Sequence, residues 1–136
     1  TVDDLARAKD LLDDVTFRRV RHVVSENQRV LNTVRALKAT GPRSIGKLLY
    51  ASHESMRDDF EISVDELDTA VETALRHGAI GARMTGGGFG GAAIALTPVE
   101  KIGEVSLSVF AEFEALGYAK PDIFAVSAAQ GAKREL

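Results

Sequence analysis

The segment ARMTGGGFGGAAIAL, residues 82–96, decides the fold because it joins two apolar runs through a cluster of glycines. Five of the six positions from 86 to 91 are glycine, and the sixth is Phe89. Glycine loses more backbone entropy on folding than any other residue, so a cluster this dense needs a reason. The flanking residues 79–84 and 92–97 are apolar and bounded by turn residues. This pattern predicts two buried strands joined by a glycine loop.

The sequence around the glycines excludes two familiar nucleotide-binding loops. Gly86, Gly88 and Gly91 fit the dinucleotide-binding spacing, but that motif needs a helix after the loop, whereas AAIALTP is typical of a strand ended by proline. A P-loop is excluded because no Gly-Lys-Ser/Thr follows. An anion-binding concavity of free N–H groups, close approach of a second loop or substrate, and a tight turn remain. A turn alone needs positive φ at only one or two positions, so five glycines favour an anion-binding concavity or a close approach over a simple turn.

Composition and charge indicate one soluble domain. The chain has 136 residues, of which 45% are hydrophobic, and a net charge of −3, which gives no sign of a nucleic-acid surface. The basic residues Arg18, Arg19 and Arg21 alternate with apolar ones and are predicted to form the solvated face of a helix. The absence of cysteine excludes disulfides and thiolate metal sites and fits a reducing cytoplasm. No segment is apolar enough to span a membrane, so we expect a single cytoplasmic domain over residues 1–136.

Helical periodicity and helix-end residues predict four helices before the glycine loop and one after it. The second is the longest, with an inward stripe from Phe17 to Leu37 that includes Asn27, expected to pair within the core, and with Gly41-Pro42 as its end. Ser63 and Glu66 predict a capping box for the fourth. The predicted helices cover residues 3–13, 17–37, 44–56, 63–75 and 97–116, and a last strand covers 122–128. The fold class is α+β, a small sheet covered by helices.

Several polar residues outside the loop are further functional candidates. HESMR at 53–57 has Arg57 where a zinc-protease helix needs its second histidine, and the three histidines lack ligand spacing, so no metal site is expected. The charge run 57–61 is either a solvated helix end or a device that fixes the loop leading to Ser63. Arg83 can face either a cleft or solvent.

The glycine loop also carries a family resemblance. GARMTGGGFGG resembles the third signature motif of the GHMP family of small-molecule kinases, which includes galactokinases, homoserine kinases and mevalonate kinases. RRVRHVVSENQRVL (18–31), SHESMRDDFEISVDELD (52–68) and the closing GAKREL resemble the C-terminal part of the galactokinases in collinear order. Ala92 departs from the cysteine common there. The resemblance implies a GHMP C-terminal-type domain with a small antiparallel, ferredoxin-like sheet, including a further strand from preceding sequence.

The same resemblance implies a site and its ligands. Galactokinases phosphorylate galactose at O1 with ATP and Mg²⁺, in a cleft between two halves where the glycine loop supports the ATP loop. Their sugar motif, Ser-rich ATP loop and catalytic Asp are not in this sequence, so an N-terminal half is the implied partner and the chain alone is expected to be inactive. The implied site residues, close to substrate and phosphates, are Thr85, Gly86, Gly87, Gly88, Phe89, Gly90 and Gly91. The resemblance implies no metal ligand here and an apolar surface prone to self-association.

Two other functions remain open at this stage. One is another GHMP kinase of the homoserine or mevalonate type, against which RHVVSEN and RDDFEIS weigh. The other is a non-catalytic, galactokinase-like sugar or ATP sensor or interaction module. Upstream sequence with an ATP loop and a catalytic Asp would favour the enzyme.

Overall fold

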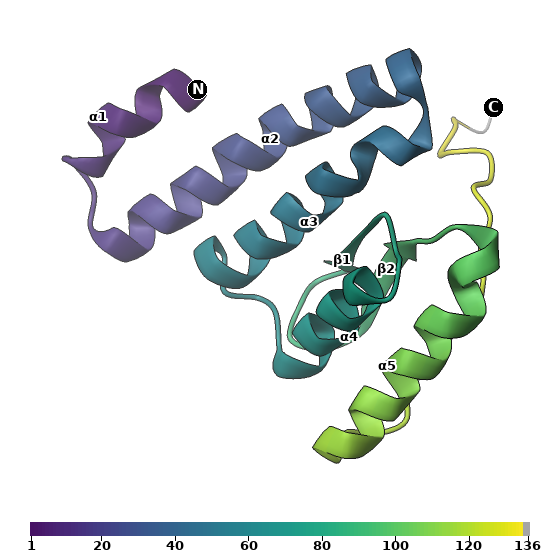
Figure 1. The fold of residues 1–136 in the computed structure, drawn as a ribbon. Coiled ribbons are helices and arrows are strands. Elements are labelled where there is room, and N and C mark those ends of the chain that lie inside the picture. Colours follow the sequence, from purple (N-terminus) through teal and green to yellow (C-terminus); the bar gives the residue numbers. More distant parts are fainter. Residues whose placement is uncertain (135–136) are drawn as a thin grey trace.

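The computed structural model describes residues 1–134 and shows a small hairpin surrounded by helices (Figure 1). Short 3-10 turns precede α1, α3 and α5, and a π-helical turn at Ser55–Asp59 follows α3. The helices and strands are α1 (Leu5–Lys9), α2 (Asp14–Thr40), α3 (Gly46–Glu54), α4 (Asp65–Arg76), β1 (Gly81–Thr85), β2 (Ala92–Leu96) and α5 (Ile102–Leu116). The α+β prediction is confirmed, and so are the two strands on either side of the glycine loop.

Local sequence signals set both ends of α2, whereas α3, α4 and α5 begin without a side-chain cap. The Asp13 side chain accepts the Thr16 amide at 3.0 Å and begins α2, and Gly41, with φ of +82°, ends it. The predicted capping box of Ser63 and Glu66 is wrong: α4 begins after Val64, whose side chain is apolar. The Ser63 hydroxyl instead donates to Asp68 Oδ1 at 2.5 Å, so it fixes the first turn of α4 from the side.

The sheet is a two-stranded antiparallel hairpin within the described residues, with Gly81 opposite Leu96 and Thr85 opposite Ala92. Strand β1 is buried between α3 and α4, whereas Ala92–Ala95 of β2 are exposed, so the prediction of a buried second strand is wrong. The predicted strand over 122–128 is also wrong: the segment has no regular structure, and Phe124 is 77% exposed. Both segments have strand-like sequences, but within residues 1–134 no further strand packs against them.

The core lies around β1. Ala82 packs with Val71 and Ala74 of α4 and Val105 of α5. Met84, fully buried, packs with Met56 and Leu67, and Ile62 and Val64 border this second cluster. At Gly46 the start of α3 lies directly on the strand, since a Cβ there would be 2.1 Å from the Ile80 carbonyl oxygen. Close backbone contact therefore fixes α3 against β1.

One face of α2 has no cover within the described chain. In Figure 1 this helix runs antiparallel to α3, with α1 beside its N-terminal half. Most of the apolar stripe predicted to face inward is exposed instead, including Val30 at 61% and Leu31 at 55%. Asn27 is exposed too, so its predicted pairing in the core is wrong. The periodicity identified the apolar face correctly, but no neighbouring element of this chain packs on it.

Candidate glycine-loop site

The loop between β1 and β2 is held in backbone conformations that favour glycine. The φ angles are +91° at Gly86, +86° at Gly88, +114° at Gly90 and +98° at Gly91. Phe89 has φ of +60°, which is uncommon for a residue with a side chain, and its ring is 76% exposed. A left-handed backbone at five of six consecutive positions exceeds what a two-residue hairpin turn needs.

The loop glycines fall into two groups according to what an added Cβ atom would meet. A Cβ built at Gly86, Gly87, Gly90 or Gly91 would meet no atom within 4 Å. At Gly88 a Cβ would lie 2.5 Å from the carbonyl oxygen and 2.6 Å from the Cβ of Ile62. The domain's own packing therefore explains Gly88, whereas nothing in the described chain occupies the space beside the other four.

The loop is hydrogen-bonded to the segment that precedes α4. The Phe89 amide donates to the Ile62 carbonyl at 2.8 Å, and the Ile62 amide donates to the Met56 carbonyl at 3.0 Å. Within residues 1–134 this is the one hydrogen bond found for an amide of positions 86–91. The glycine amides are thus available to an acceptor, as in a backbone concavity that binds anions.

The donor set of the loop fits a phosphate better than a metal ion. Thr85–Gly91 carry no charged side chain, so free amides would meet phosphate oxygens without repulsion. Mg²⁺ prefers carboxylate oxygens, which this loop lacks, and no group of three or more His, Cys, Asp or Glu residues in the described chain is arranged to hold a metal. The loop thus offers backbone amides suited to an anion and no carboxylate suited to Mg²⁺.

His53 supports β1 from behind. Its imidazole is fully buried, and its Nδ1 accepts the Met84 amide at 3.2 Å. This fixes the proton on Nε2, which lies 3.0 Å from Asp68 Oδ1 without regular hydrogen-bond geometry. Burial lowers the pKa of His53, against the raising effect of the Asp68 charge. His53 thus joins α3, β1 and α4 as a neutral core histidine.

The basic run of α2 and the charge run 57–61 pair with each other. Arg18 and Arg19 pair with Glu61, Arg19 also donates to the Asp59 carbonyl, and Arg21 Nε donates to Asp59 Oδ2 at 2.9 Å. Asp59 is buried, whereas Arg21 is 46% exposed and Arg18 and Arg19 are about one-third exposed, so the predicted arginine face is only partly solvated. Sequence inspection missed this because the partners lie about 40 positions apart. Arg57 pairs with Asp58 and reaches Glu72 of α4.

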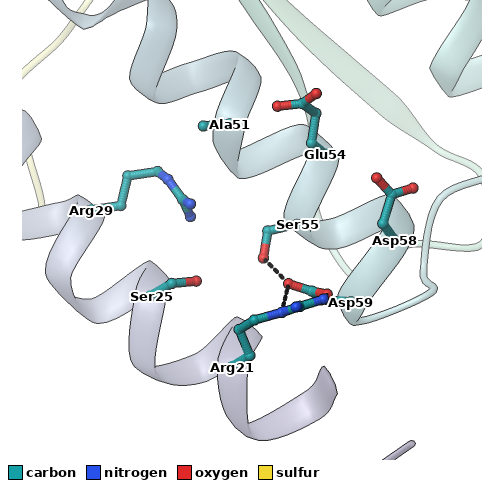
Figure 2. Close-up of a pocket in the computed structure, with 8 residues that line it drawn as sticks. All are labelled: Arg21, Ser25, Arg29, Ala51, Glu54, Ser55, Asp58 and Asp59. Carbon is teal, nitrogen blue, oxygen red and sulfur yellow. Dashed lines mark hydrogen bonds and ion pairs between the residues drawn. The ribbon is translucent and has the colours of Figure 1, made fainter. Parts of the chain in front are cut away.

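An open cleft of about 430 Å³ lies beside these ion pairs, between α2 and the end of α3 (Figure 2). Ser55 and Asp59 line this cleft, and the Ser55 hydroxyl donates to Asp59 Oδ2 at 3.4 Å and lies 3.0 Å from His22 Nδ1. The carboxylate contacts the serine rather than the histidine, and the His22 ring stacks on Phe60 at 4.5 Å. Since this order does not activate serine as a nucleophile, the cluster is structural. Burial lowers the pKa of His22.

Arg83, whose direction the sequence left open, lies between β1 and the α2–α3 pair. Its Nε donates to the Met84 carbonyl at 2.9 Å, its Nη2 lies 3.3 Å from Met56 Sδ, and its Nη1 is 3.9 Å from Glu26 Oε2. The side chain is 29% exposed, and burial lowers its pKa. It lines a groove with Val30, Val34, Leu48 and Leu49.

Comparison with known proteins identifies the protein family to which the chain belongs. The family model for the C-terminal domain of GHMP kinases matches residues 33–115, which include the glycine loop, and the chain belongs to this family. No helix of the described residues is both long and apolar enough to cross a bilayer.

Within that class, the chain is similar to galactokinases. It is 47% identical to the Mycobacterium tuberculosis galactokinase over 94% of its own length and 35% of that protein, and 47% identical to the Streptomyces coelicolor galactokinase over 96% and 34%. The crystal structure of Lactococcus lactis galactokinase complexed with galactose superposes with a TM-score of 0.81 at 40% identity, covering 87% of this chain and 31% of that one. The crystal structure of L. major mevalonate kinase in complex with R-mevalonate superposes with a TM-score of 0.60 at 27% identity, covering 84% of this chain and 33% of that one. The chain spans about a third of the length of these relatives.

Proposed function

We propose that this chain is the C-terminal domain of a galactokinase, in which it acts with a nucleotide- and sugar-binding half to phosphorylate galactose at O1. The observation that carries the proposal is the open space beside Gly86, Gly87, Gly90 and Gly91, in a loop anchored from its other side at Ile62. Such a loop is firmly placed yet has bare backbone toward something outside the domain. Similarity to galactokinases along most of the chain supports this assignment.

The proposed contribution of the loop is support and electrostatics rather than proton transfer. ATP with Mg²⁺ supplies the phosphoryl group. Phosphoryl transfer depends mainly on positioning and on stabilising negative charge. The loop offers backbone amides and no side chain that abstracts a proton, so the base and the metal ligands belong to the other half. Thr85–Gly91 then hold the partner's phosphate loop in place, close to the phosphates and the sugar.

The uncovered face of α2 gives the other half a surface on which to dock. Val30, Leu31, Val34 and Leu37 form an apolar strip along this helix, each more than 40% exposed. A continuous apolar strip on a domain surface is typical of an interface. The proposed occupant is the half that galactokinases carry in addition to this domain, since the relatives are about three times as long.

The test is a kinase assay on the complete protein encoded by the gene that carries this sequence. We expect ADP release that requires both galactose and ATP–Mg²⁺, with galactose 1-phosphate identified by ³¹P NMR, and no turnover with the 136-residue chain alone. Homoserine and mevalonate in place of galactose distinguish the other GHMP kinases. Binding of galactose without turnover would identify a sensor and contradict the proposal.

A further inference from the structure

Glu61 has an unusual backbone for its residue type. Its φ is +58°, and apart from Phe89 it is the one non-glycine residue with positive φ among residues 1–134. Side chains disfavour this region, so the conformation persists only where its surroundings impose it. The two residues are connected by one hydrogen bond. The Phe89 amide donates to the carbonyl of Ile62, which directly follows Glu61.

Two arginines of α2 hold the Glu61 carboxylate. Arg18 Nη2 lies 2.9 Å from Oε1, and Arg19 Nη2 bonds to Oε2, so each oxygen has its own partner. Arg19 also donates to the Asp59 carbonyl, on the other side of Phe60. The side chains of Arg18 and Arg19 are about one-third exposed and that of Glu61 is 47% exposed, so both ion pairs lie at the surface. The bond from Arg19 holds the pKa of Glu61 below its usual value.

We propose that Glu61 is a positioning residue: its ion pairs with Arg18 and Arg19, here called the clamp, fix the position of the glycine loop through the Ile62 carbonyl. The clamp fixes the backbone of Glu61, and the next peptide unit carries the carbonyl that accepts the Phe89 amide and meets Gly88. The consequence for catalysis rests on the proposed function, in which the loop supports the phosphate loop of the other half.

Few contacts other than those with Ile62 hold the glycine loop in place. Within the described residues the loop has one amide hydrogen bond, and Gly88 is the one loop glycine where an added Cβ would meet another atom, on Ile62. A shift of the Ile62 carbonyl would therefore move the loop with little resistance from the loop's own bonds. The Met84 amide, in β1 just before the loop, donates to His53 rather than to Ile62.

Amide hydrogen exchange in the 136-residue chain, followed by NMR, tests the clamp directly. The variants are Glu61→Gln, which keeps the size and removes the charge, and Glu61→Asn, which tolerates positive φ and keeps the fold if the first variant is unstable. Glu100→Gln is the matched control, an exposed glutamate beyond the far end of β2. We expect about five-fold faster exchange at the Phe89 amide in both Glu61 variants, the size expected for losing two partly exposed ion pairs. Exchange at Met84 and in the control should change less than two-fold.

An unchanged Phe89 rate, or equal acceleration at Phe89 and Met84, would overturn the proposal, because the clamp would then be either irrelevant or merely a source of global stability. In the complete enzyme, Glu61→Gln should lower kcat and raise KM for ATP together, by about ten-fold in kcat/KM, with the thermal midpoint held within a few degrees. Normal kinetics there would overturn the catalytic part. If the complete wild-type protein does not phosphorylate galactose, the proposed function fails, while the exchange result still decides the clamp.

Discussion

Adding one methyl group at Gly88 should destabilise the domain, whereas the same change at Gly87 should not. At Gly88 the new Cβ would lie 2.5 Å from the Ile62 carbonyl oxygen, and the φ of +86° disfavours any side chain. The backbone term is about 1–2 kcal/mol and the overpacking term about 1–3 kcal/mol, so we expect Gly88→Ala to lose about 2–5 kcal/mol of unfolding free energy. Gly87 has open space and no left-handed φ, so Gly87→Ala should stay within about 0.5 kcal/mol of wild type.

Urea unfolding of the chain, followed by circular dichroism, measures both variants. Equal m-values would show that the change lies in stability rather than in the extent of unfolding. Gly103→Ala, at an exposed helical position that also has open space, is a control for the loss of glycine entropy in the unfolded state. Equal stability of Gly88→Ala and Gly87→Ala would refute the anchoring of the loop on Ile62.

Three further outcomes follow from the packing. His53→Ala should lose about 2–4 kcal/mol in urea unfolding, because it opens a cavity and leaves the Met84 amide without its acceptor; a loss below 1 kcal/mol would contradict this. The pKa values of His22 and His53 are lowered in the folded state, so the unfolded chain takes up protons first and stability should fall as the pH drops below about 6.5; a flat profile between pH 8 and 5.5 would contradict it. Sedimentation should show concentration-dependent self-association of the chain, weakened by Val30→Lys; a strict monomer at millimolar concentration would contradict an apolar docking face on α2.

Helix ends and strands that depend on neighbouring residues in the sequence were predictable. Gly41 and Gly117 end helices with left-handed backbones, and the apolar runs beside the glycines form β1 and β2. The capping box at Ser63 failed because its hydroxyl finds a better partner in the Asp68 carboxylate. Local pattern thus identified the elements, and tertiary contacts decided which local bonds form.

What covers an apolar face was not predictable from the pattern. The periodicity of α2 indicates one apolar side, but Val30 and Leu31 are exposed since their cover does not lie in this chain. Likewise, the five loop glycines look alike in the sequence, and only the tertiary packing distinguishes Gly88, which lies against Ile62, from the rest. Ile62 itself carries no sequence signal, because it acts through its backbone carbonyl.

The most direct test of the central claim is the steady-state kinetics of Gly87→Val in the complete protein, with the thermal midpoint measured on the same preparation. Gly103→Val is the matched control, since both positions have open space in the domain. If the loop supports the partner's phosphate loop, kcat should fall and KM for ATP should rise together at an unchanged midpoint, and the control should behave as wild type. A lower kcat with intact ATP affinity would instead indicate direct phosphate contact. Normal kinetics in folded Gly87→Val would contradict any role of the open glycines in catalysis.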